Sequence, residues 1–266
     1  MTRITFWAGL RATYGDSVAF VRACPWLALL PVAFELLQHV VEVRSGMNDS
    51  IDAAQAHADD PVRLVFGFLK VMALTVPAYW VVRFLPRRDA AFASRADAPA
   101  LRLFAVYLAV QAILDAIDLF VLPRTGAWQA GAALAGLVEG GLLAAWTVAA
   151  PLGNPAVGLL GSVRLMARRL PWTLAFQLAA FLPLMVPHYL LGTFAIMGRK
   201  SLMWPTLALD ALLVGYLTPV IIASTYYAAM RAADLAGTSL LSNRHGAGPI
   251  FHGSDGAGGH EHGANI

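Results

Sequence analysis

The sequence predicts an all-α, polytopic membrane protein with six transmembrane helices. Of its 266 residues, 58% are hydrophobic and only 13% are charged, whereas an average soluble domain carries about 25% charged residues. The mean hydropathy is +0.62. Several apolar runs reach the length of about 20 residues that a helix needs to cross a bilayer. This composition excludes an ordinary soluble enzyme or a nucleic-acid-binding domain as a description of the whole chain.

The expected membrane domain covers residues 1–236. Its six spans are expected at residues 18–41, 62–85, 100–122, 127–150, 170–194 and 203–230. These runs are too long and too uniformly apolar for the strands of a membrane β-barrel, and helices satisfy every backbone polar group within lipid. The single cysteine, Cys24, excludes a disulfide framework.

The distribution of basic residues predicts the orientation of the spans. Most of the 19 Lys and Arg residues lie at the N-terminus, in the 86–99 and 151–169 loops, or just after the last span. Loops rich in Lys and Arg stay on the cytoplasmic side of a membrane. We therefore expect both termini to be cytoplasmic. The excess of Arg over Lys and the abundance of alanine indicate a GC-rich bacterium. We therefore expect a multi-pass protein of the bacterial cytoplasmic (inner) membrane.

Two spans begin with a similar motif. Arg22 and Trp26 flank a proline where the first span opens, and Arg169 and Trp172 do so where the fifth opens. Proline fits the first turn of a helix, and Arg and Trp suit the membrane interface. The pattern predicts three helical hairpins, with short cytoplasmic-side interfacial helices over residues 4–14 and 157–170. Interfacial anchoring alone would also explain the motif.

The last span closes with a further pattern, Tyr226-Tyr227 followed after three residues by Arg231. Together with the interfacial helices and the three Arg/Trp-flanked hairpins, this pattern resembles the YciC-type bacterial inner-membrane proteins. It is also similar to the membrane domain found beside some glycerophosphodiester phosphodiesterases. The resemblance covers most of residues 4–235. It implies six helices and a role in the envelope or with lipids, and it implies no catalytic residues.

Ionisable side chains inside the spans are the main functional signal, because each costs about 2.5–3.5 kcal/mol on insertion scales. In the first span, Glu35, Gln38, His39 and Glu42 share one helix face. In the third span, Tyr107, Gln111, Asp115 and Asp118 share another, and in the second span Arg63 and Lys70 lie seven residues apart. Glu139, His188 and Asp210 complete the set.

With the expected orientation, all of these charges except Glu139 fall in the outer half of the membrane. We therefore predict a polar chamber toward the outer face. The residues expected to line it are Glu35, His39, Lys70, Asp115, Asp118, His188 and Asp210. The leading hypothesis is a non-enzymatic protein that handles a lipid or small amphiphile through this chamber, or that supports envelope homeostasis. Membrane lipids are the expected partners.

Three alternatives remain open at the level of sequence. The carboxylates could serve a proton- or cation-coupled transporter. The spacing of Asp115 and Asp118 could hold Mg²⁺ in an intramembrane enzyme. The polar side chains could also only reach for water or tie helices together. The sequence contains no phosphate-binding loop or dinucleotide fingerprint, so we expect no cofactor.

The last segment, residues 237–266, differs from the rest of the chain. It is rich in glycine and histidine and ends in His260-Glu-His262. Dense glycine makes ordering costly in entropy, so we expect an unstructured cytoplasmic tail. His-rich tracts can bind metal ions, and His260 and His262 are the candidates in this segment.

Overall fold

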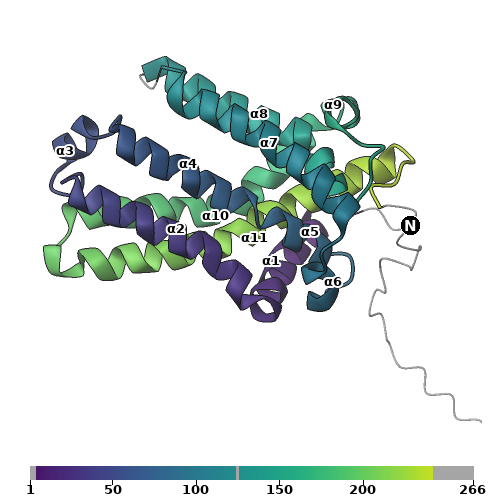
Figure 1. The fold of residues 1–266 in the computed structure, drawn as a ribbon, viewed down its shortest axis with the longest axis horizontal. Coiled ribbons are helices and arrows are strands. Elements are labelled where there is room, and N and C mark those ends of the chain that lie inside the picture. Colours follow the sequence, from purple (N-terminus) through teal and green to yellow (C-terminus); the bar gives the residue numbers. More distant parts are fainter. Residues whose placement is uncertain (1–3, 124–125, 242–266) are drawn as a thin grey trace, which may run out of the picture.

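The computed structural model describes residues 4–123 and 126–241. Every regular element within these two stretches is helical, and six helices there are long and apolar enough to cross a membrane. The predicted all-α, polytopic fold is therefore confirmed. The tail residues His260 and His262 lie outside the described residues. Figure 1 shows the long helices running along one axis of an elongated bundle.

The long helices agree with the predicted spans in number and differ from them in their bounds. They are α2 (Pro25–Arg44), α4 (Pro61–Thr75) continued by α5 (Ala78–Phe84), α7 (Ala98–Phe120), α8 (Gly126–Ala149), α10 (Leu170–Met197) and α11 (Met203–Leu235). The first span begins at Pro25 because the preceding helix ends at Ala23. The second span is interrupted between Thr75 and Ala78, where Pro77 has no N–H to continue the helical ladder.

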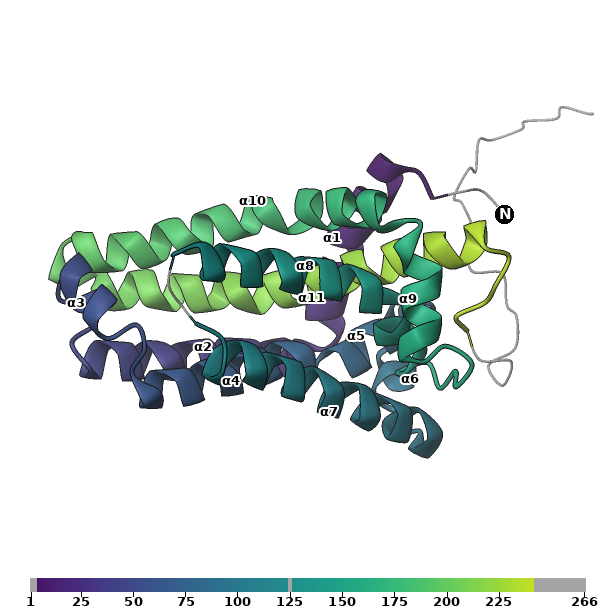
Figure 2. The ribbon, with the colours of Figure 1, turned by 90° about the horizontal axis from the view of Figure 1, so that it is seen from above.

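Shorter helices precede each pair of spans. These are α1 (Phe6–Ala23), α6 (Ala90–Ser94) and α9 (Leu159–Ala167). All three lie in the same half of the bundle, on the right in Figures 1 and 2; we call this the terminal end. Helix α3 (Ile51–Ala56) and the 3₁₀-helix η1 (Lys200–Leu202) lie at the opposite, loop end. The order of one shorter helix and two spans thus occurs three times.

Helix α1 is longer than the interfacial segment predicted over residues 4–14, and part of it packs into the bundle. Thr5 begins it by accepting a hydrogen bond from the Ala8 N–H. The Tyr14 hydroxyl donates to the Ala180 carbonyl in α10, at 2.6 Å. Burial raises the pKa of the Tyr14 phenol. An amphipathic segment can therefore lie against other helices as well as against lipid.

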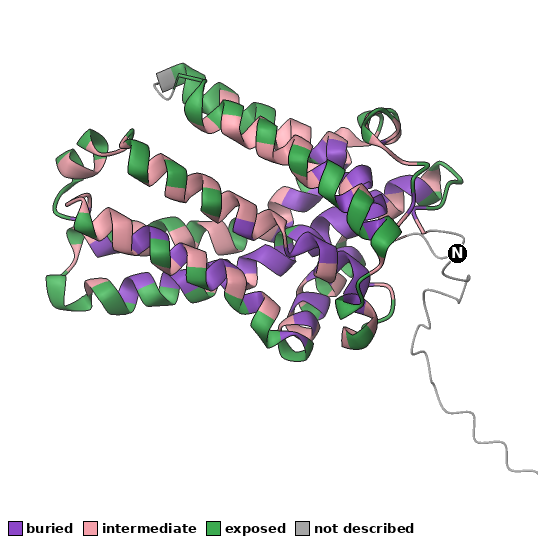
Figure 3. Ribbon diagram, viewed as in Figure 1, coloured by how far each residue is buried: buried purple, intermediate pink, exposed green. Residues whose placement is uncertain are grey.

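Helix α11 is the central helix of the bundle. Of its most apolar window, 67% is buried, compared with 11% for α7; Figure 3 shows the same contrast. Small side chains on α11 allow its neighbours to approach closely. At Gly215 a Cβ would collide with Val32 Cγ2 of α2 and would lie 3.3 Å from the Ala28 carbonyl oxygen. Glycine at this position brings α2 and α11 together.

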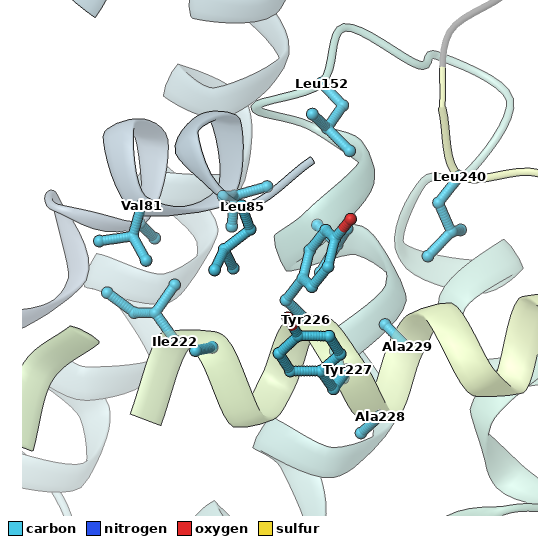
Figure 4. Packing of buried hydrophobic residues seen from close by; sticks show 14 of the residues in the cluster. Val81, Leu85, Leu152, Ile222, Tyr226, Tyr227, Ala228, Ala229 and Leu240 are labelled. Atoms are coloured by element: carbon cyan, nitrogen blue, oxygen red, sulfur yellow. The ribbon is translucent and has the colours of Figure 1, made fainter. Parts of the chain in front are cut away.

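The terminal half of α11 lies within the hydrophobic core. Figure 4 shows Tyr226 and Tyr227 among Val81, Leu85 and Leu152. Both tyrosines are buried, at 3% and 4% exposure. The closing Tyr-Tyr motif therefore contributes to packing.

The two Pro-Trp motifs occupy different environments. Trp26 is 82% exposed, and Arg22 beside it is exposed too. Trp172 instead stacks on Phe176, with ring centroids 4.9 Å apart. The guanidinium of Arg231 lies 4.0 Å from the Trp172 ring centroid. Trp26 therefore suits an interfacial anchor, whereas Trp172 joins α10 to the end of α11.

The ordered packing continues beyond the predicted domain boundary at residue 236. Leu240 is fully buried and lies near the aromatic core in Figure 4. Asn154 Nδ2 donates to the Ser239 carbonyl oxygen at 3.1 Å. The first residues of the Gly/His-rich segment, up to Leu241, are thus part of the folded protein.

Candidate functional site

A charged cavity of about 380 Å³ lies between α2, α4, α10 and α11 toward the loop end of the bundle. Figure 2 shows α2 and α4 on one side of this region and α10 and α11 on the other. Its acidic, basic and histidine lining residues are Glu35, His39 and Glu42 of α2, Arg63 and Lys70 of α4, His188 of α10 and Asp210 of α11. We call these seven side chains the cavity cluster.

Helix α2 supplies three members of the cavity cluster, because the spacing of these residues in the sequence places them on one side of the helix. Glu35, His39 and Glu42 are spaced by four and three residues, so they lie on one helical face, and this face is directed toward α4 and α11. Lys70 is seven residues after Arg63, which places both on the same face of α4. Asp210 lies on the loop-end half of α11, five residues before Gly215, where α2 approaches α11 closely.

A chain of hydrogen bonds runs through the centre of the cluster. His188 Nδ1 lies 2.7 Å from Asp210 Oδ1. The other carboxylate oxygen of Asp210 lies 3.2 Å from His39 Nε2. On the far side of the same ring, His39 Nδ1 lies 3.2 Å from Glu42 Oε2. Imidazole and carboxylate groups from three helices thus alternate along one continuous path.

Two ion pairs flank this chain. Lys70 Nζ lies 3.1 Å from Glu35, and Arg63 Nε lies 3.5 Å from Glu42 Oε1. Three carboxylates therefore face two permanently positive side chains, so the cluster has a net charge of −1 when both histidines are neutral. It is neutral overall when His39 carries a second proton, which lets both of its ring nitrogens donate to carboxylates. Glu35 and Asp210 are each only 1% exposed. Buried charge is costly unless it is paired, so a further positive charge would stabilise this cavity.

Gln38 adds a polar atom without a partner. Its Nε2 donates to Glu42 Oε1 at 2.8 Å. Its Oε1 is buried and accepts no hydrogen bond from any part of the chain that the structure describes. Because Gln38 also lines the cavity, a small turn of its amide would bring this oxygen to a molecule inside it.

The seven residues predicted to line one chamber divide into two groups. Glu35, His39, Lys70, His188 and Asp210 line the charged cavity, whereas Asp115 and Asp118 do not. Asp115 and Glu139 are bridged by Gln111, whose Nε2 lies 3.4 Å from an oxygen of each. Asp118 is exposed. Across residues 4–123 and 126–241, the group of His and carboxylate side chains close enough to share an ion contains neither aspartate of the Asp115/Asp118 pair.

Two cavity residues outside the predicted set were detectable from the sequence. Glu42 shares the helix face of Glu35 and His39, and Arg63 shares that of Lys70. Both were recognised on these faces, although neither was among the seven residues predicted to line the chamber. The loop residues Met47 and Asn48 also border the cavity, and no periodicity in the sequence indicates them.

A second, mid-bundle cavity of about 270 Å³ lies between α4, α5, α7, α8, α10 and α11. Its lining is mainly apolar, with Tyr107, Gln111, Thr147, Gln177 and Thr225 among the polar members. On α4, Val71 lines this cavity directly after Lys70 lines the charged one. On α11, Asp210 lines the charged cavity and Thr218 lines the mid-bundle cavity. The two residues are eight positions apart, which is about 12 Å along the helix. The two cavities therefore follow one another along the same helices.

A separate buried carboxylate, Asp16, lies at the terminal end. Asp16 of α1 accepts a hydrogen bond from the Tyr227 hydroxyl of α11, and its other oxygen lies 2.7 Å from Arg88 Nη2. Arg88 has a φ of 51°, a left-handed conformation that costs about 1–2 kcal/mol for a residue with a Cβ. These contacts tie α1, α11 and the loop after α5 together.

Comparisons with protein-family models, with curated proteins and with solved structures found no match to this chain. The resemblance to the YciC-type proteins therefore stays a prediction.

Proposed function

We propose that this integral membrane protein binds a lipid or small amphiphile, with the polar headgroup in the charged cavity and the apolar part in the mid-bundle cavity. The observation that carries this proposal is the succession of a charged and a mainly apolar cavity along α4, α10 and α11. An amphiphile has the same succession of polar and apolar parts.

The chemistry of the charged cavity favours a zwitterionic headgroup. Lys70 and Arg63 lie on α4 and offer positive charge to a phosphate. Glu35 and Asp210 on α2 and α11 offer negative charge to an amine. The ammonium group would pair with these carboxylates, and the phosphate would pair with the two cations of α4. A headgroup with both a phosphate and an amine therefore fits both the basic residues of α4 and the acidic residues of α2 and α11.

The proposed setting is the cytoplasmic membrane of a bacterium, with both termini in the cytoplasm. The basic residues near the terminal end support this orientation through the positive-inside rule. In this orientation the charged cavity lies toward the outer face. The ligand would then come from the outer leaflet or from the space beyond it. Support of envelope homeostasis is compatible with such a role.

The test measures binding of a fluorescent lysophospholipid with an ethanolamine headgroup to the purified protein in detergent. We expect saturable binding to the wild type and at least tenfold weaker binding to Lys70→Met, since the headgroup phosphate loses a cation. The matched control is Arg102→Met, which removes an exposed basic residue of α7 outside the cavity lining and should leave binding unchanged. Absence of saturable binding, or equal binding by Lys70→Met, contradicts the proposal.

A second candidate is a proton- or cation-coupled transporter. The observation that favours it is the path from His188 through Asp210 and His39 to Glu42, because alternating imidazoles and carboxylates can pass protons. Uptake into proteoliposomes that collapses with the proton gradient would favour this function over simple binding.

A further inference from the structure

The centre of the cavity cluster has the ligand types and spacing of a metal site. Glu35, His39 and Asp210 each offer one atom, and these three atoms lie within 4.8 Å of one another. His39 Nε2 lies 3.2 Å from Asp210 Oδ2 and 3.5 Å from Glu35 Oε1. Ligands about 2.0–2.2 Å from a tetrahedral zinc ion are separated from each other by about 3.3–3.6 Å. An ion would therefore need only small side-chain movements.

The side chains that contact His39 and Asp210 from the far side also favour a metal site. His39 Nδ1 points to Glu42 Oε2 at 3.2 Å. When Nδ1 donates to this carboxylate, the lone pair of Nε2 faces Asp210 and Glu35. A carboxylate behind a histidine in this way orients the ring and makes it a stronger metal ligand. Asp210 is supported similarly, since its second oxygen is held by His188 Nδ1 at 2.7 Å.

Two further features separate this cluster from an ordinary group of buried acids. Gln38 lines the cavity, and its buried Oε1 has no hydrogen-bond donor among the residues described, so a small turn of the amide would let it accept a hydrogen bond from a water bound to an ion. Lys70 and Arg63 offset two of the three carboxylates. With both imidazoles neutral, as metal ligation requires, one negative charge remains, which is a favourable environment for a divalent cation.

We propose that Glu35, His39 and Asp210 bind a divalent transition-metal ion of the Zn²⁺ class. The mixture of imidazole nitrogen and carboxylate oxygen suits Zn²⁺ better than Mg²⁺ or Ca²⁺, which prefer oxygen ligands alone. Three protein ligands leave a fourth position open toward the cavity for water or another ligand. Lys70 keeps Glu35 paired in the absence of the ion and turns into the cavity when the ion binds. This proposal goes beyond the proposed amphiphile binding and does not require it.

The test is a titration of the full-length protein with Co²⁺ and Zn²⁺ in detergent without added lipid. All four tail histidines, His245, His252, His260 and His262, are replaced by alanine so that they do not contribute. We expect one Co²⁺ per chain, with the visible absorption of a four-coordinate site, and its displacement by one equivalent of Zn²⁺.

Single substitutions test whether the metal ion binds at these three residues. His39→Gln and Asp210→Asn remove a ligand and should weaken Zn²⁺ binding at least 100-fold. His188→Gln removes the support of Asp210 and should weaken it about 10–100-fold. The control His57→Gln changes a histidine after α3 that does not line the cavity and should bind as the parent does. A monodisperse gel-filtration profile and unchanged helical circular dichroism show that each variant is folded.

Three results would overturn the proposal. The first is absence of stoichiometric Co²⁺ or Zn²⁺ binding in the protein without tail histidines. The second is unchanged affinity in the folded His39→Gln and Asp210→Asn variants. The third is equal loss in His57→Gln. Because no lipid is added, metal binding can be present while the lysophospholipid assay fails, or the reverse, so the two proposals are tested separately.

Discussion

Asp210 and Asp16 are both buried carboxylates that form hydrogen bonds across the bundle, yet their surroundings differ. Asp210 projects from α11 into a cavity of about 380 Å³ and contacts two histidines. Asp16 projects from α1 and contacts Arg88 and the hydroxyl of Tyr227, and Tyr227 belongs to the hydrophobic core shown in Figure 4. The partners of Asp210 are titratable and can bind metals, whereas those of Asp16 stay a donor and a permanent cation at neutral pH.

This difference shows that burial of a carboxylate does not by itself indicate a functional site. A carboxylate with permanent donors on all sides holds helices in place. A carboxylate beside a cavity and exchangeable donors can also bind a ligand. Asp16 therefore belongs to the framework that closes the terminal end, and Asp210 belongs to the candidate site at the loop end.

The largest expected effect on stability comes from Asp16→Ala. This change leaves the buried Tyr227 hydroxyl without its acceptor and Arg88 without its counter-ion, so we expect a loss of about 2–3 kcal/mol. Asp210→Ala should cost less than half as much, because the adjacent cavity is large enough for water to solvate the freed imidazoles. Thermal unfolding in detergent, followed by circular dichroism, measures both. An Asp210→Ala variant at least as unstable as Asp16→Ala would contradict this comparison.

A smaller loss of stability is expected from Gly215→Ala, about 1–2 kcal/mol, because the added methyl group overpacks the contact of α11 with α2. The same change separates Asp210 from His39, so it should also weaken Zn²⁺ binding. Gly67→Ala on α4 is the matched control, since no described residue lies within 4 Å of a Cβ there. It should keep or increase stability, because alanine favours the helix. Equal stability of the two variants would show that close packing at Gly215 is unimportant.

The smallest effect concerns Cys24, the single cysteine of the chain, which directly follows α1. Burial raises the pKa of its thiol, so less of the reactive thiolate is present at neutral pH. We expect maleimide labelling at least tenfold slower in the folded protein than in SDS. Labelling should accelerate in Asp16→Ala, which loosens α1, and stay slow in Asp210→Ala. Equal labelling rates in these two variants would show that Asp16 does not hold α1 in its packed position.

Part of the candidate site follows directly from the sequence. Glu35 and His39 lie one turn apart, so any helix places them on one face. The opposite charge of Lys70 and its depth in the second span made a pairing with α2 reasonable. The same reasoning failed to separate Asp115 and Asp118 from this group, because their depth is similar and only the rotation and position of α7 keep them out of the cavity.

Periodicity could not reveal that rotation. In a soluble protein, the apolar face of a helix is the buried face. In a membrane, lipid is as apolar as the protein interior, so a face rich in leucine can lie against either. Helix α7 illustrates this, since only 11% of its most apolar window is buried. For the same reason the sequence did not distinguish the exposed Trp26 from Trp172, which packs against Phe176 and Arg231.

The sequence by itself determined the class of this protein and the number of its long, membrane-crossing helices. The physical reason is that crossing a bilayer demands about 20 apolar residues and internally bonded backbone, and both demands are local. Only the tertiary structure decided which polar residues meet. His39, Asp210 and His188 come from three helices, and they lie together because α2 and α11 approach closely at Gly215 and α10 packs beside α11. Such contacts depend on packing between distant segments, which no local pattern specifies.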